Sequence, residues 1–262
     1  MMEKRKAGKI IAAVNNKGGV AKTTSAVSLA AGLAAEGRRV LLADLDAQAS
    51  ASLSLGIARA DLLPSAAEVL LQGLPVQEAV RRSYVEGLDI LTGSMALSSA
   101  DLVLADRTGR EAVLRSALTP ARREYDVIIL DCPPSLGLVP VNALTAADLF
   151  FVPMTPDYLA LEGLVNLMEA VERIRAGIGK TADLLGILLT LCDYRLNATA
   201  EIIGMIRRHY GRQVFKTEIK SNVRLKEAPS FGKSIFAYDN GSAGAEAYRE
   251  LTKEVIQRIN KA

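Results

Sequence analysis

Short apolar runs alternate along the chain with longer segments in which apolar residues recur every three or four positions. The short runs are typical of strands buried on both faces, and the longer segments are typical of amphipathic helices. Because strands and helices alternate, right-handed crossovers and an α/β fold are predicted, with a doubly wound, mostly parallel sheet and helices on both faces. The expected strands are 9–15, 39–45, 88–91, 126–130, 149–154, 184–191 and 214–219, and the expected helices are 22–36, 66–72, 110–118, 158–176, 198–210 and 244–259.

The pattern continues without an internal repeat, a low-complexity stretch or a long linker. We therefore expect residues 1–262 to form a single domain, with residues 1–8 as a flexible basic tail. Half of the residues are hydrophobic, but only 5% are aromatic and there is no Trp. Small aliphatic side chains must therefore fill the core, which suits helices packed closely on a parallel sheet.

The cysteines and the apolar runs bear on location. Cys132 and Cys192 lie far apart without a CxxC motif, so we expect two core thiols in a reducing compartment. The first apolar run, residues 10–14, is too short for a signal peptide, and no run reaches the ~20 apolar residues that a membrane span needs. These features predict a cytoplasmic protein.

Polar residues gather directly after three of the predicted strands. Residues 15–24 follow the first strand, Asp44 and Asp46 end or follow the second, and Asp131 follows the run that ends at Leu130. In a doubly wound sheet, ligands bind beyond the carboxyl ends of the strands. The three clusters should therefore meet at one edge of the sheet.

The loop from Asn15 to Thr24 has the composition of a phosphate site. Gly18 and Gly19 let the backbone approach phosphate oxygens, and the following helix presents its N-terminus. Lys22 is placed to reach the β- and γ-phosphates, and Thr23 to bind Mg²⁺. The strict pattern G-x-x-x-x-G-K-[ST] fails, because Asn16 and Ala21 occupy its glycine positions. A simple turn that binds nothing is the alternative.

The string KGGVAKTT at 17–24 resembles the deviant Walker A motif of the ParA/MinD superfamily, in which a second lysine precedes the glycine pair. Further strings at family spacing are VLLADLDAQ at 40–48, YDVIILDCPP at 125–134, LALEGL at 159–164, NVRLKEAPS at 222–230 and GAEAY at 244–248. The chain is thus similar over nearly its whole length to ParA/Soj-type partition ATPases, which are P-loop enzymes that hydrolyse ATP.

This resemblance implies ATP and Mg²⁺ as cofactors and a set of roles. Lys22 contacts the phosphates, Lys17 crosses a dimer interface to the partner's phosphates, and Asp46 orients the attacking water. Thr23 and Asp131 hold Mg²⁺, and Asp44 lies near the metal or in the switch network. The implied nucleotide contacts are Lys17, Gly18, Gly19, Val20, Ala21, Lys22, Thr23, Thr24 and Pro229.

Three departures from the family pattern stand out. Ala21 replaces a commoner Gly, Ala47 replaces a Pro, and Lys220 and Ser221 stand where Soj-like chains often have Pro-Arg. The last departure puts the exact DNA contacts in doubt.

Charge favours one branch of the superfamily. Between residues 195 and 233 there are nine Lys or Arg and three Glu, in a chain whose net charge is only +3. Such a cluster suits non-specific DNA, for which we choose Arg195, Lys220 and Arg224 as first contacts. We therefore expect an ATP-dependent homodimer on nucleoid DNA, released by hydrolysis that a ParB-like partner stimulates, with no membrane contact.

Two alternatives from the superfamily remain. A MinD-like protein that cycles on membranes would use the apolar stripe of the last helix, which includes Tyr248, Leu251 and Val255. We favour packing of that stripe on the sheet. An iron–sulfur carrier is disfavoured because the spacing of Cys132 and Cys192 does not resemble that of cluster ligands.

Overall fold

The computed structural model describes residues 7–261, in which eight strands form one sheet in the order β3-β4-β2-β5-β1-β6-β7-β8. β3 runs antiparallel to β4, and the other neighbours are parallel, which confirms the predicted fold class. The strands are β1 (Lys9–Ala13), β2 (Val40–Asp44), β3 (Val80–Arg82), β4 (Leu88–Leu91), β5 (Val127–Asp131), β6 (Leu149–Met154), β7 (Asp183–Cys192) and β8 (Val214–Lys220).

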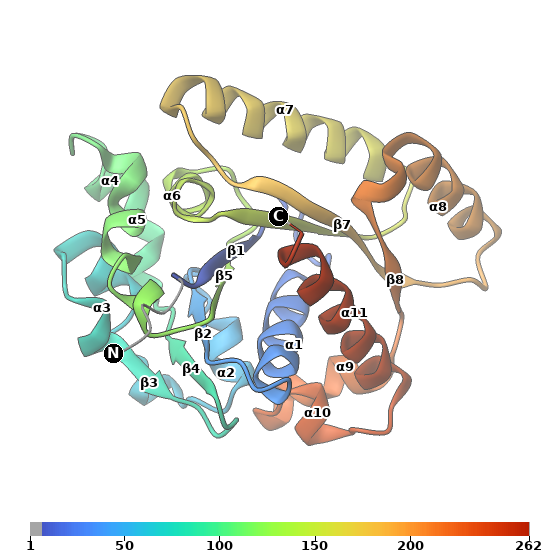
Figure 1. Ribbon diagram of the computed structural model, residues 1–262, viewed down its shortest axis with the longest axis horizontal. Coiled ribbons are helices and arrows are strands. Elements are labelled where there is room, and N and C mark those ends of the chain that lie inside the picture. Colours follow the sequence, from blue (N-terminus) through green and yellow to red (C-terminus); the bar gives the residue numbers. More distant parts are fainter. Residues whose placement is uncertain (1–6, 262) are drawn as a thin grey trace.

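Helices cover both faces of this sheet (Figure 1). The α-helices are α1 (Lys22–Ala35), α2 (Ser50–Ser54), α3 (Val76–Ala79), α4 (Ala100–Val103), α5 (Val113–Leu118), α6 (Leu138–Ala146), α7 (Ala160–Ile178), α8 (Asn197–Tyr210), α9 (Val223–Glu227), α10 (Ile235–Tyr238) and α11 (Ala243–Ile259). Short 3-10 turns are η1 (Arg59–Asp61), η3 (Met95–Ser99), η4 (Arg110–Ala112), η5 (Ala121–Arg123), η6 (Gly211–Gln213) and η7 (Ala228–Phe231), and η2 (Glu68–Gln72) is a π-helical turn.

Alternate residues of each central strand enter two different cores. In β1, Ile10 and Ala12 pack with the layer that contains α5 to α8, whereas Ile11 and Ala13 pack with α1 and α11. All four side chains are at most 1% exposed. Burial on both faces explains why these strands read as continuous apolar runs in the sequence.

The last helix belongs to the second core. Tyr248, Leu251 and Val255 of α11 are at most 1% exposed, and α11 lies so close to α1 that a Cβ at Gly32 would collide with Thr252. The apolar stripe of α11 therefore packs in the core on the sheet, which is the alternative that we favoured. Among the described helices, none is both long enough and apolar enough to cross a bilayer.

The ends of most predicted elements lie within one or two residues of the prediction, but β3, α6 and the short helices α2, α3, α4, α9 and α10 were missed. α6 is buried along most of its surface, so it lacks the polar face that reveals a helix in a sequence. β3 has three residues and lies at the sheet edge, which is too short to show alternation.

The predicted N-terminal tail ends earlier than residue 8. The Gly8 N–H donates to the Arg122 carbonyl at 2.7 Å, and a Cβ at Gly8 would overlap the Tyr125 carbonyl. Gly8 is thus part of the folded chain, because β1 must start beside β5. The rest of the predicted tail, apart from Ala7, lies outside the described residues.

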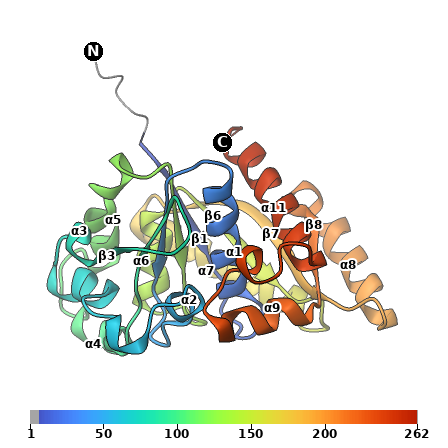
Figure 2. The same ribbon diagram turned by 90° about the horizontal axis from the view of Figure 1, so that it is seen from below.

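Strand order places the phosphate loop at the centre of the sheet. β1 lies between β5 and β6, where the direction of winding reverses. Figure 2 shows the sheet from a second side, with α1 packed beside β1. We call the end of the sheet where the parallel strands terminate the carboxyl edge, and the opposite end the amino edge.

Candidate active site

The phosphate loop joins the end of β1 to α1 at the carboxyl edge. Gly19 has a φ of +73°, and added Cβ atoms at Gly18 or Gly19 would meet no atom within 4 Å. Ala21 precedes α1 with a left-handed φ of 59° and no side-chain cap. The first N–H groups of α1 consequently have no intrahelical acceptor and face an open cradle, as an anion requires.

Three hydrogen bonds fix the base of this loop. The Asn15 side chain donates to the Pro153 carbonyl at 2.7 Å and accepts from the Lys17 N–H at 2.9 Å. The Thr190 hydroxyl of β7 donates to the Val20 carbonyl at 3.0 Å. β6 and β7, which lie on the same side of β1, therefore hold the loop at two points, a role that we did not predict for Asn15 and Thr190.

Lys22 is only 7% exposed, and its Nζ donates to the Lys17 carbonyl at 2.8 Å. Burial lowers the pKa of Lys22, although Asp131, Cys132 and Asp46 oppose this shift. The described residues give Lys22 no ion pair within 4 Å. Its charge is thus buried and available for an anionic ligand in the cradle.

Lys17, the other lysine of the loop, has a partner that we did not predict. Its Nζ lies 2.5 Å from Oδ2 of Asp157, which also accepts from the Thr155 hydroxyl at 2.5 Å. Both bonds outweigh the effect of burial and lower the pKa of Asp157. Asp157 follows β6 at the carboxyl edge, and that position was the available signal in the sequence.

Asp44 ends β2 with its carboxylate fully buried. It accepts from the Ser52 N–H at 2.8 Å, from the Ser52 hydroxyl at 2.7 Å and from the Asp46 N–H at 3.2 Å. Burial raises its pKa to about 6 despite the Ser52 bonds. These bonds hold the segment that follows β2 and includes α2, which we call the switch segment. They also occupy most of the Asp44 lone pairs, which leaves few for the metal that Asp44 was predicted to bind.

Asp131 ends β5 opposite Asp44 in the parallel register. It is fully buried, and within residues 7–261 neither of its carboxylate oxygens has a hydrogen-bond partner. Burial is the largest cause that raises the pKa of Asp131 well above its usual range, and the Asp44 carboxylate adds to this effect. Nearby Thr23 lowers the pKa, although its hydroxyl does not meet hydrogen-bond geometry with the carboxylate. A buried carboxylate left in this state is the donor that Mg²⁺ prefers.

Asp46 lies next to these buried acids but is partly exposed. Its Oδ1 accepts from the Gln48 N–H at 2.9 Å, and its Oδ2 has no side-chain partner among the described residues. Burial lowers the pKa of Lys22, and the Asp46 charge lies close enough to this lysine of the phosphate loop to oppose that shift. That position suits contact with a water molecule, as the predicted role requires.

The far side of the site is formed by the segment that follows β8. Pro229 lies in η7, and Phe231 stacks on Tyr238 with ring centroids 5.1 Å apart. Gly56 and Gly232 approach so closely that a Cβ at Gly232 would lie 2.8 Å from the Gly56 Cα. This contact joins the switch segment to the segment around Pro229, which the sequence did not reveal.

Comparison with known proteins agrees with this geometry. Residues 8–184 match the family described as "AAA domain". The chain is 43% identical to the sporulation initiation inhibitor protein Soj of Bacillus subtilis, over 95% of this chain and 98% of that protein. It is 44% identical to the chromosome-partitioning ATPase Soj of Thermus thermophilus, over 96% and 97% respectively. The chain belongs to the ParA/Soj family of chromosome-partitioning ATPases.

A solved structure extends the comparison to ligands. Cobyrinic acid a,c-diamide synthase from Mycobacterium smegmatis, with bound ADP and magnesium, has a TM-score of 0.84 and 33% identity. The match covers 97% of this chain and 96% of that chain. The ParA/Soj chain thus shares its fold with a protein that holds ADP and magnesium.

The three DNA contacts predicted for this ParA/Soj chain lie near the carboxyl edge, and all three are engaged. Arg195 pairs with Asp193 at 2.5 Å and lowers the pKa of Asp193 to about 2. Arg224 lies 3.0 Å from Glu227 and 3.3 Å from Asp239. The Lys220 ammonium lies 5.7 Å from the centre of the Tyr194 ring. The ion pairs reduce the free charge of Arg195 and Arg224, whereas Lys220 keeps its charge, and the DNA role of all three residues stays a prediction.

The prediction that the two cysteines are core residues is confirmed. Cys132 and Cys192 are free and buried, as core residues should be. Burial raises the pKa of both thiols. Among the described residues, no group of three His, Cys, Asp or Glu side chains could bind a metal by itself. A metal at Asp131 would therefore need further ligands from a nucleotide, from Thr23 or from water.

Proposed function

We propose that this protein hydrolyses ATP in order to position DNA. In this proposal, ATP drives formation of a sandwich dimer through the carboxyl edges of two chains. The dimer binds DNA without sequence preference, and hydrolysis, stimulated by a ParB-like partner, releases it. The family relationship supports the partition role, and the geometry described below supports ATP and Mg²⁺ as cofactors.

The observation that carries the proposal is the pair of buried, unneutralised charges beside the glycine cradle. Lys22 and Asp131 are both buried, and neither has an ion pair among the described residues. In the apo fold this arrangement costs free energy, which a phosphate group and a cation would recover together. Asp131 and Thr23 would hold Mg²⁺, which when bound neutralises charge on the phosphate oxygens.

Hydrolysis requires a water molecule aligned with the γ-phosphate. Asp46 is the acid that borders the cradle with partial exposure, so we assign it the orientation of this water. Lys17 would supply positive charge to the partner's phosphates, which requires that it leave Asp157 when the dimer forms. The Lys17–Asp157 pair thus belongs to the monomer, and its loss accompanies dimerisation.

Membrane cycling has less support. The apolar stripe of α11 is buried in the second core and cannot also insert into a lipid surface. DNA is the polyanion that the basic C-terminal third would meet, and we propose association with nucleoid DNA in the cytoplasm.

The test uses Asp46→Ala and Lys17→Ala with ATP and Mg²⁺. Asp46→Ala should bind ATP and dimerise in size-exclusion chromatography, yet hydrolyse it poorly, and the trapped dimer should bind random duplexes in fluorescence anisotropy. Lys17→Ala should bind ATP without normal hydrolysis. An Asp46→Ala protein that stays monomeric with ATP, or that ignores DNA at low salt and sediments with anionic liposomes, would contradict the proposal.

A further inference from the structure

The basic residues that are contiguous in the sequence separate into two groups in the fold. Lys216 lies near the start of β8 and Lys220 at its end, so this strand carries them to opposite edges of the sheet. Arg195 and Arg224 lie at the carboxyl edge, while Arg212 lies at the amino edge beside the start of β8. The predicted basic cluster is therefore not one surface, a correction to the interpretation from sequence.

A groove of about 890 Å³ opens at the amino edge. The first residues of β6, β7 and β8 form its inner wall, and the C-terminal ends of α8 and α11 form its sides. Five cationic residues and one acid line it: Arg207, Arg212, Lys216, Arg258, Lys261 and Glu254. We call this feature the amino-edge groove.

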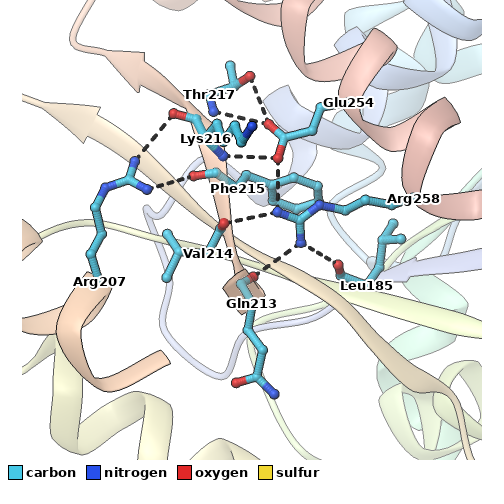
Figure 3. A network of polar contacts seen from close by, with 9 residues as sticks. All are labelled: Leu185, Arg207, Gln213, Val214, Phe215, Lys216, Thr217, Glu254 and Arg258. Carbon is cyan, nitrogen blue, oxygen red and sulfur yellow. Dashed lines mark hydrogen bonds and ion pairs between the residues drawn. The ribbon is translucent and has the colours of Figure 1, made fainter. Parts of the chain in front are cut away.

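The floor of the groove is a saturated polar network (Figure 3). Arg258 donates to the Leu185, Gln213 and Val214 carbonyls and to Glu254, and its guanidinium lies 4.1 Å from the centre of the Phe215 ring. Arg207 reaches the same strand from α8 and donates to the Phe215 and Lys216 carbonyls. These two arginines are committed to the fold.

Glu254, the single acid of the groove, is also fully engaged. It accepts from the Lys216 and Thr217 N–H groups, from the Thr217 hydroxyl and from Arg258, all within 3.1 Å. It therefore has no oxygen left for another cation. The network makes the floor rigid and fixes the strand that carries Lys216.

The rim differs from the floor. Arg212, Lys216 and Lys261 are exposed, and no ion pair joins any of their side chains to an acid among residues 7–261. At the carboxyl edge, by contrast, Arg195 and Arg224 already pair with Asp193, Glu227 and Asp239. Among the described residues, exposed cations without an ion pair also occur at Arg208, Lys220, Lys226 and Lys233, but the rim gathers three such cations around one groove.

Free cations are the ones that gain most from a polyanion. A cation that neutralises a DNA phosphate releases a condensed counterion, whereas one already paired with an acid must first lose that partner. The C-termini of α8 and α11 oppose anion binding within about one turn, by roughly 0.3–1 kcal/mol each in exposed settings. At 0.1 M salt each phosphate contact is worth on the order of eightfold in affinity, which is more than this penalty.

We propose that the amino-edge groove binds DNA, and that its Arg212, Lys216 and Lys261 side chains contact phosphates of the duplex backbone. This inference rests on the proposed function. Dimerisation through the carboxyl edges leaves both amino-edge grooves facing outward, on opposite ends of the dimer. Each ATP-bound dimer then offers two separate DNA surfaces and can hold two duplexes.

The test compares two triple variants in the ATP-trapped Asp46→Ala parent. The groove variant is Arg212→Gln, Lys216→Gln, Lys261→Gln. Its matched control is Arg82→Gln, Arg115→Gln, Arg173→Gln. This control removes three exposed cations from other parts of the fold, and none of them forms an ion pair among the described residues. Circular dichroism and ATP-dependent dimerisation establish that both variants fold and bind nucleotide.

Fluorescence anisotropy with random duplexes is then measured across a salt series. The groove variant should bind on the order of 100-fold more weakly at 0.1 M salt, with a salt slope lower by about 2 to 3 for each chain that contacts the duplex. The control should match the parent. If the parent dimerises but does not bind DNA, both the proposed function and this inference are overturned. If the groove variant binds DNA as tightly as the parent, only this inference is overturned. Groove-dependent sedimentation with phosphatidylglycerol vesicles, without DNA binding, would also overturn it.

Discussion

The two edges of the sheet differ in which of their charged side chains, the buried or the exposed ones, form ion pairs. At the carboxyl edge, Lys22 and Asp131 are buried and lack ion pairs, while the exposed cations Arg195 and Arg224 are paired. At the amino edge, Arg258 and Glu254 are largely buried and paired, while the exposed cation Lys216 is free.

This contrast separates charges that serve a ligand from charges that serve the fold. A buried charge without a partner destabilises the apo protein and is kept where a ligand completes it. A buried charge with all of its partners stabilises the strand beside it and is unavailable to a ligand. The state of the buried charges therefore identifies the active site better than the number of charges does.

The largest expected effect comes from Lys22→Ala. Loss of the charge that faces the β- and γ-phosphates removes charged hydrogen bonds worth about 3 kcal/mol or more, so ATP affinity should fall by more than about 100-fold. Isothermal titration calorimetry measures this change. Lys180→Ala, an exposed lysine, is the control and should leave affinity unchanged. If Lys22→Ala bound ATP with near wild-type affinity, the assignment of residues 15–24 as a phosphate loop would be wrong.

Next in size is Arg258→Ala at the amino edge. It removes the Arg258 donor from Glu254 and from the carbonyls of Leu185, Gln213 and Val214, so the free energy of unfolding should fall by about 3 kcal/mol. Urea denaturation measures the loss. Lys261→Ala, two residues beyond the end of the same helix, should change stability by less than about 0.5 kcal/mol. Equal effects of the two variants would contradict the distinction between floor and rim.

A smaller effect with the opposite sign is expected for Asp131→Asn. Because the folded protein raises the pKa of Asp131, its ionised form opposes folding as pH rises above the ordinary value of 3.8. The variant should therefore be more stable than the wild type by about 1–2 kcal/mol at pH 7 without nucleotide, and this gain should shrink toward pH 4. It should also lose the extra thermal stabilisation that Mg²⁺ adds to ATP.

Glu254→Gln is the control with the reverse pH dependence. Burial is outweighed by the Lys216 and Thr217 amides and by Arg258, so the pKa of Glu254 is lowered from 4.5. Its contribution to stability is present above pH 4.5 and is lost as pH falls through the folded value. Glu254→Gln should thus be less stable than the wild type at pH 7 and approach it in acid. The same sign for both variants would break the comparison between the edges.

The smallest effect concerns the backbone of the phosphate loop. Ala21 holds a left-handed φ of 59°, a conformation that costs an L-residue with a Cβ roughly 1–2 kcal/mol. Ala21→Gly should relieve this cost, less the entropy of Gly, for a net gain of at most about 1 kcal/mol. Gly19→Ala, at a φ of +73°, should lose a similar amount. Thermal denaturation without nucleotide measures both.

Much of the fold and of the phosphate loop could be predicted because the signals are local. A buried parallel strand must be apolar at every position, and the spacing of Gly18, Gly19 and Lys22 is set within a few residues of chain. Asp44 and Asp131 could be brought together in advance because neighbouring parallel strands end at one edge. The prediction failed where no local signal exists, as in α6, which is buried along most of its surface and has no polar face.

Sequence alone determined the family, the fold class and the positions of Lys17, Lys22, Asp46 and Asp131 relative to the strands. Only the tertiary structure decided which charges meet. It paired Lys17 with Asp157 and Asp44 with Ser52, and it divided one basic segment between two edges of the sheet. The reason is physical: electrostatic energy depends on distance and burial in space, and a single strand can separate residues that a sequence places only four positions apart.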